Sequence, residues 1–197
     1  MTKLTLADIV DLRAYERERG TLRKNIIELK KLRRVPLGNL VTLVFENRET
    51  IRFQIQEMAR AEKMIRDEQI EMELNIYNPL IPAFGELKAT LFLELTDKEM
   101  LQKWLPALVG IEGSVYLRLG DSEDSPILPS HSDQDHLSQL TRPDVTSSVH
   151  YIWWKLEGEL IERFKSSPVF LGIDHINYKA EVNLSRDLVE SLVSDWL

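Results

Sequence analysis

Histidine and carboxylate side chains close to expected strand ends are the residues of this sequence best suited to chemistry. Glu46 ends one apolar segment, His150 lies inside another, and Asp174 and His175 lie between two more. Imidazole and carboxylate groups bind divalent metals and transfer protons near neutral pH. Strand ends that gather at one edge of a sheet often carry such sites. The sequence therefore permits a metal site of Glu46, His150, Asp174 and His175, or an acid–base site of Glu46, Glu57, His150 and His175.

Each of these residues also has an ordinary structural explanation. His150 lies within the apolar segment SVHYIWWKL, so we expect it to be largely buried and to need a hydrogen-bond partner. Asp174 and His175 belong to the segment DHIN, and Asp and Asn are common in turns because their side chains bond nearby backbone. His131 and His136 lie in an acidic loop, where binding a metal would first require ordering the chain.

A polar run at 45–64, FENRETIRFQIQEMARAEKM, is expected to change from strand to helix near Thr50. At about 100° per residue, one face of this helix holds Ile51, Ile55, Met58, Ala61 and Ile65, with Glu62 in its middle and Gln54 and Glu57 at its edge. The opposite, solvent face holds Arg52, Gln56, Arg60 and Lys63. A carboxylate on the buried face needs a partner, and Arg48 and Arg52 are the nearest cations. We therefore expect a polar network of Arg48, Arg52, Gln54 and Glu62 that locks the helix to a sheet.

A cluster of cations marks the segment that follows Gly20. One helix is expected to end at Gly20, and a second, at about 22–34, is expected to end before Pro36. The cations of the second helix are Arg23, Lys24, Lys30, Lys31, Arg33 and Arg34. They could bind phosphate or nucleic acid, but no aromatic side chains lie between them. Cations near a helix C-terminus are also favoured by the helix dipole, and we prefer this interpretation.

Composition excludes several classes of protein. The 197 residues contain no cysteine, which rules out disulfides and cysteine-ligated clusters. We find no glycine-rich phosphate loop, dinucleotide turn or nucleophile elbow, so we expect no nucleotide cofactor. A net charge of −7 argues against nucleic-acid binding, and no segment is long and apolar enough to span a membrane. We expect a soluble cytoplasmic protein whose cofactors are unknown, with a divalent metal as one option.

The pattern of expected elements predicts an α+β fold. About six strands and six or seven helices can be traced, and the last two strands, near 168–173 and 177–184, have hairpin spacing. A hairpin favours a mixed, mostly antiparallel sheet with helices packed on it. We expect a single domain over 1–197, with an N-terminal helical arm at 1–36 and a long acidic loop at 121–147.

Several segments together resemble an uncharacterised bacterial family, domain-of-unknown-function family number 3501. They are VFENRETIRFQIQEMARAEK, YNPLIP, ELKATLFLEL, SSVHYIWW and LGIDHINY, in this order. Some members of that family are encoded beside rubrerythrin-like and iron–sulfur oxidoreductase proteins. The resemblance therefore implies a link to redox or oxidative-stress physiology, although it supplies no mechanism. The Glu-x-x-His motif of a rubrerythrin-type iron site is absent from the helices.

Two functions follow from these observations. The missing motifs favour a non-catalytic accessory or binding protein, with a redox protein or a second copy of the chain as its partner. For self-association, the N-terminal arm or the C-terminal helix with Trp196 would supply the interface. The alternative is a metal-binding protein or acid–base enzyme that uses the Glu, His and Asp residues named above.

Overall fold

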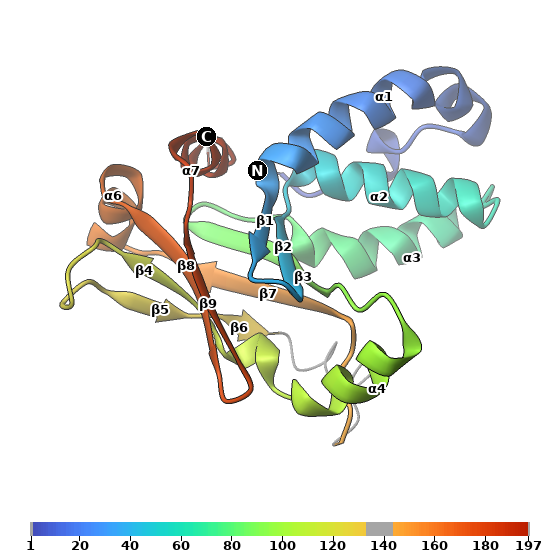
Figure 1. Ribbon diagram of the computed structural model, residues 1–197. Coiled ribbons are helices and arrows are strands. Elements are labelled where there is room, and N and C mark those ends of the chain that lie inside the picture. The colour runs from blue at the N-terminus through green and yellow to red at the C-terminus, as the bar shows by residue number, and fades with distance from the viewer. Residues whose placement is uncertain (1, 133–143, 197) are drawn as a thin grey trace.

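A five-stranded antiparallel sheet, sheet A, forms one wall of the core (Figure 1). The computed structural model describes residues 2–132 and 144–196. In spatial order the strands are β1 (Arg34–Leu37), β2 (Val41–Phe45), β3 (Glu86–Leu93), β7 (Val149–Lys155) and β6 (His131–Ser132). Alternation along β2 sends Leu43 and Phe45 to one face and Thr42 and Val44 to the other, and all four are buried. Sheet A is therefore covered on both faces near its centre.

A second antiparallel sheet, sheet B, forms the opposite wall. Its order is β5 (Ile127–Pro129), β4 (Val115–Leu119), β8 (Val169–His175) and β9 (Tyr178–Asn183). The chain crosses from sheet B to sheet A at Ser130, whose amide donates to the carbonyl of Val115. At the other edge, the hydroxyl of Tyr178 donates to the carbonyl of Leu37, 2.7 Å away. The two sheets are thus joined at both edges.

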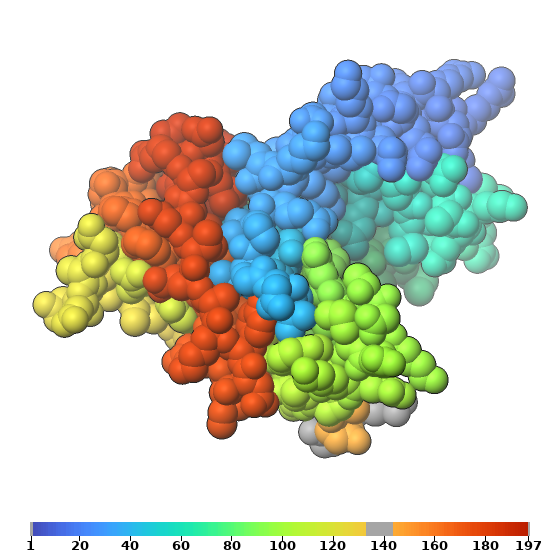
Figure 2. All heavy atoms as spheres, viewed as in Figure 1, coloured from blue at the N-terminus to red at the C-terminus, as the bar shows by residue number. Residues whose placement is uncertain are grey.

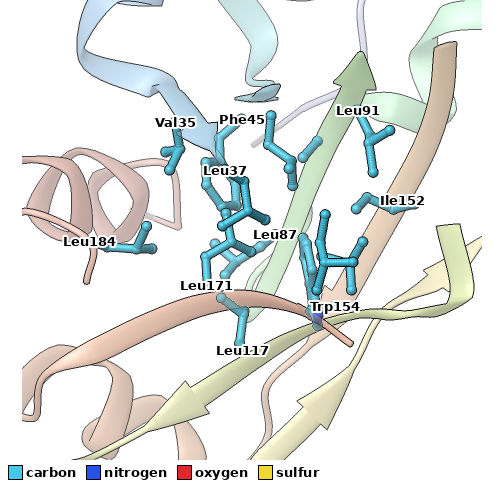
Figure 3. Close-up of a cluster of buried hydrophobic side chains, with 14 of the residues drawn as sticks. Val35, Leu37, Phe45, Leu87, Leu91, Leu117, Ile152, Trp154, Leu171 and Leu184 are labelled. Carbon is cyan, nitrogen blue, oxygen red and sulfur yellow. The ribbon is translucent and has the colours of Figure 1, made fainter. Parts of the chain in front are cut away.

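The main core lies between these sheets (Figure 3). Phe45, Leu91 and Trp154 enter it from sheet A, and Leu117 and Leu171 enter it from sheet B. Fully burying a side chain of this size stabilises the fold by about 1.5–3 kcal/mol. The alternating strands predicted from sequence supply these residues.

Three helices form a helical arm beside the sheets, with α2 between α1 and α3 (Figure 1). They are α1 (Leu12–Arg33), α2 (Arg48–Ala61) and α3 (Asp67–Tyr77), so the helical arm extends beyond the residues 1–36 expected for it. The remaining helices are α4 (Lys98–Ala107), α6 (Glu159–Ser166) and α7 (Arg186–Ser194), with 3-10 turns η1 (Leu6–Asp8), η2 (Asn78–Leu80) and η3 (Ile111–Gly113). A second apolar cluster of Leu4, Ile51, Ile55, Leu74 and Ile81 holds the arm together. Among the helices described, none is long and apolar enough to cross a membrane.

The predicted α+β class is confirmed, but the single sheet of about six strands is two sheets of five and four strands. β1 occupies a segment in which Pro36 was expected to end the preceding helix, and β5 and β6 lie within the expected acidic loop. Proline is tolerated in β1 because this strand is at the edge of its sheet. Gly20 does not divide the N-terminal helices, because α1 continues through it.

Packing on the outer face of sheet B depends on Gly172. A Cβ added there would lie 2.2 Å from Cζ of Tyr116, whose hydroxyl donates to Glu181 at 2.8 Å. We expect Gly172→Ala to lower the free energy of unfolding by about 1–3 kcal/mol in urea denaturation. Gly113→Ala is the control, since its added Cβ would meet nothing within 4 Å. Equal stability of the two variants would contradict this packing.

Candidate functional site

A buried ion pair holds the base of the helical arm. Arg33, at the end of α1, donates to both carboxylate oxygens of Asp195 at 2.6 and 2.9 Å, and both side chains are buried. The side-chain amide of Asn47 donates to the same carboxylate at 3.2 Å. Burial raises the pKa of Asp195, while Arg33 and Asn47 oppose this shift. The pair ties α1, the start of α2 and the end of α7 together.

Glu46 is buried next to this pair, in a setting that is satisfied internally. Its carboxylate accepts hydrogen bonds from the hydroxyls of Thr50 at 2.6 Å and Thr90 at 2.7 Å. Asn47 caps α2, since its side-chain oxygen accepts from the amide of Thr50 at 3.0 Å. These bonds fix the strand-to-helix change that the sequence places near Thr50. They leave Glu46 as a structural anchor of α2.

Glu57 is paired with residues of α1. It accepts from Nε and Nη2 of Arg19 at 2.7 and 2.9 Å, and from the hydroxyl of Tyr15 at 2.6 Å. The Arg19 guanidinium lowers the pKa of Glu57 to about 2, and burial raises the pKa of Tyr15. A carboxylate held in this way stays ionised and is a poor proton acceptor near neutral pH.

The predicted network of Arg48, Arg52, Gln54 and Glu62 is divided among separate partners. Arg48 pairs with Asp8 at 2.5 Å, and Arg52 with Glu49 at 3.5 Å. Gln54 bonds to Tyr151, whose pKa is raised by burial. Glu62 was expected on the buried face but is exposed, because α2 ends at Ala61 and Lys63 adopts a left-handed conformation with φ of 53°.

Gln56, expected on the solvent face of α2, is buried instead. Its side-chain oxygen accepts from the amide of Val10 at 3.1 Å, and its side-chain nitrogen donates to the carbonyl of Val10 at 2.9 Å. The segment before α1 covers this side of α2. The sequence of α2 alone does not reveal that cover.

His150 is buried, as predicted, and faces a carboxylate that the sequence analysis did not identify. Its Nε2 lies 2.9 Å from the carbonyl of Ser147, which can only accept, so Nε2 carries the proton. Its Nδ1 lies 3.7 Å from Oε2 of Glu112, and both atoms are buried without a hydrogen-bond partner. When the ring is neutral and Nε2 carries its proton, Nδ1 of His150 and Oε2 of Glu112 are both acceptors and face each other. Burial lowers the pKa of His150, and the carboxylate of Glu112 opposes this shift.

Asp174 and His175 do not join His150 or Glu46. His175 donates from Nε2 to the carbonyl of Val109 at 3.1 Å, and its Nδ1 accepts from the amide of Asn177 at 3.2 Å. Asp174 is exposed and pairs with Lys179 at 2.5 Å. The four metal candidates therefore have separate sets of partners. Within residues 2–132 and 144–196, no group of three His, Asp or Glu side chains could hold a metal ion.

The other pair of candidate histidines lies in the acidic loop. His131 belongs to β6, and its ring stacks on Trp153 with 4.5 Å between the centroids. His136, with the neighbouring Asp133 and Asp135, lies outside the described residues.

One helix of the arm exposes an apolar stripe that the sequence analysis missed. On α3 and the residue before its N-cap, Ile65 is 84%, Met72 64% and Ile76 43% exposed. Glu68 and Glu71 flank this stripe on one side and Glu73 on the other. We call these six residues the α3 face. The sequence contains a signal of this stripe. Ile70, Leu74 and Tyr77 form the buried side of α3, so Met72 and Ile76 must lie on the opposite side of the helix.

A hollow of about 400 Å³ lies beside this face, at the tip of the arm. Leu6, Ile9, Met64 and Ile70 line it, with Arg13 among its polar residues. Ile65 belongs both to this hollow and to the α3 face. Asp67 also lines the hollow, and Glu68, Glu71 and Glu73 lie nearby, so acidic side chains gather here. Burial and the nearby Glu62 raise the pKa of Glu73. An apolar centre with a polar rim is the usual anatomy of a protein-binding surface.

The outer face of sheet B is neutralised by its own residues. Glu181 accepts from the hydroxyl of Tyr116 at 2.8 Å and from Nη2 of Arg118 at 2.6 Å. Arg118 also lies over the ring of Phe170, 4.0 Å from its centroid. Burial and Glu181 raise the pKa of Tyr116 to about 12. These side chains satisfy one another, whereas residues 2–132 and 144–196 supply no ion-pair partner within 4 Å to the carboxylates of the α3 face.

Fold and site together define a two-sheet α+β protein with a helical arm, in which the predicted catalytic residues are divided among separate structural contacts. The chain matches the family model described as "Protein of unknown function (DUF3501)" over residues 3–196, and it belongs to this family. It is similar to the crystal structure of a novel protein of unknown function from Burkholderia pseudomallei K96243, with 33% identity, a TM-score of 0.89 and 100% of both chains covered. No curated protein matches the chain.

The buried ion pair makes a prediction about stability. Arg33→Met would leave Asp195 buried without its cation, so we expect the free energy of unfolding to fall by about 3–5 kcal/mol in urea denaturation. The control is Arg34→Met, which removes a half-exposed pair with Glu94. This variant should change the free energy of unfolding by less than about 1 kcal/mol. Similar losses in the two variants would show that the buried pair has no special role.

Proposed function

We propose that this protein is a non-catalytic accessory protein that binds a protein partner through the α3 face. The observation that carries this proposal is the exposed stripe of Ile65, Met72 and Ile76 next to a hollow. Large exposed apolar side chains that are contiguous and rimmed by polar groups mark interaction sites. In contrast, Glu46, Glu57 and His175 are each satisfied by bonds within the fold.

We propose a setting in redox or oxidative-stress physiology. Its support is the gene neighbourhood of the family, which includes rubrerythrin-like and iron–sulfur oxidoreductase proteins. A chain without cysteine suits the reducing cytoplasm, and it takes no part in thiol chemistry itself. The protein would therefore assist a redox system through binding.

Site-specific photo-crosslinking in cells of the native host tests the binding function. With a photoreactive residue in place of Met72, we expect discrete crosslinked adducts, because this side chain is 64% exposed at the centre of the α3 face. The matched control is Ile176, an exposed isoleucine in the β8–β9 turn. Adducts at neither position, or equally at both, would contradict the proposal.

A second candidate function, proton transfer by His150 and Glu112, is favoured by one observation. Their unpartnered atoms face each other at 3.7 Å, and one shared proton would convert this contact into a hydrogen bond or ion pair. The ring of His150 is only 1% exposed, so a substrate could reach it only if η3 moved. For this reason we rank binding first.

Titration of His150 by NMR tests this second candidate. Because the Glu112 carboxylate favours the charged ring, Glu112→Gln should lower the pKa of His150 further. Since burial places the folded pKa below 6.5, the stability gained from the neutral ring is complete above pH 6.5. It is lost as pH falls from 6.5 toward the folded pKa. A pKa that does not change in Glu112→Gln would show that the two groups share no proton.

A further inference from the structure

The solvent side of α1 carries the opposite charge to the α3 face. Ile27 is 40% exposed there, and Arg23, Lys24, Lys30 and Lys31 surround it. Lys31 pairs with Glu28 at 2.7 Å, whereas the structure of residues 2–132 and 144–196 gives the other three cations no ion-pair partner within 4 Å. We call these five residues the α1 face. It repeats the plan of the α3 face, with an apolar centre and charged flanks, but with positive charge.

The two helices differ in charge as a whole. α1 contains eight basic and three acidic residues, while α3 contains four acidic residues and no basic one. Charge complementarity of this kind steers association and selects the partner, while burial of the apolar centre supplies affinity. Each of the two surfaces is the type of partner that the other requires.

The parts of the two faces that lie on α1 and α3 also match in length. Arg23 to Lys31 and Glu68 to Ile76 both span eight residue steps, which corresponds to about 12 Å along a helix. Ile27 lies in the middle of the first span, and Met72 in the middle of the second. Two helices packed side by side over this length would therefore place apolar centre on apolar centre and carboxylates near cations.

The α3 face cannot meet the α1 face of its own chain, because α2 lies between the two helices (Figure 1). In the space-filling view, α1 forms an outer edge of the molecule (Figure 2). We therefore infer that the α3 face binds the α1 face of a second copy of this chain, an inference that rests on the proposed binding function. Because each copy carries both faces, a two-fold pair makes the contact twice, whereas an open arrangement continues to a third copy.

Charge reversal tests this inference with the full-length protein. Arg23→Glu/Lys24→Glu/Lys30→Glu leaves one cation and three carboxylates on the α1 face, which makes it acidic. Glu68→Lys/Glu71→Lys leaves two cations and one carboxylate on the α3 face, which makes it basic. In sedimentation equilibrium we expect the wild type to associate. Each variant should have a dissociation constant at least about tenfold higher, so that its average mass stays near the monomer mass of 22.9 kDa. In the equimolar mixture both contacts are complementary again, so association should return.

The matched control is Glu123→Lys/Asp124→Lys. It changes the net charge by the same amount as Glu68→Lys/Glu71→Lys, but at exposed positions outside both faces. It should associate like the wild type, and wild-type association should weaken in high salt. A monomeric wild type, a control that dissociates like Glu68→Lys/Glu71→Lys, or a mixture that stays monomeric would overturn the inference. Circular dichroism of each variant confirms that it is folded.

Crosslinking at Met72 separates this inference from the proposed function. An adduct of twice the chain mass supports both. An adduct of another mass, with none at twice the chain mass, supports the binding function and overturns the second copy as occupant. If Met72 gives no adduct, both fail.

Discussion

The arrangement of the arm depends on the buried ion pair of Arg33 and Asp195. Transferring both charges from water is costly, so the pair depends on the hydrogen bonds that both side chains make, although Nε of Arg33 is buried without a partner among the described residues. Asp195 accepts from Arg33 and Asn47, and Arg33 also donates to the carbonyl of Ser191 at 2.8 Å. Since these residues come from the end of α1, the start of α2 and the end of α7, one contact joins the first and last helices to the strand-to-helix junction. It thereby fixes the base of the helical arm against the two sheets.

A fixed base determines which surfaces remain free. Arg33 faces inward and anchors the last turn of α1, so the cations one to three turns earlier on its other side point to solvent. Glu46 and Asn47 set the start of α2, and the pairing of Glu57 with Arg19 and Tyr15 holds α1 along it. α3 then packs on α2 through its Leu74 side and leaves Met72 and Ile76 exposed. The polar residues that looked suited to catalysis thus position the α3 face, the surface that we propose for binding.

Sequence patterns predicted the features that depend on neighbouring residues. The β8–β9 hairpin and the burial of His150 are both present. The short strands β5 and β6 were missed, because three and two residues have no measurable periodicity. The partners of Glu57 and the carboxylate of Glu112 that faces His150 could not be inferred, since they come from distant segments. The helix α2 ends at Ala61, before the left-handed residue Lys63, and Glu62 therefore lies in solvent and not on the buried face of the helix.

When two copies meet as inferred, the α1 face of one copy and the α3 face of the other become covered. Hydrogen–deuterium exchange, compared between dilute and concentrated protein, measures this cover directly, because amides in a docked helix open less often. We predict slower exchange at high concentration in 23–34 and 67–77, with no change in the β8–β9 hairpin. Exchange in both helices that is independent of concentration would contradict the account.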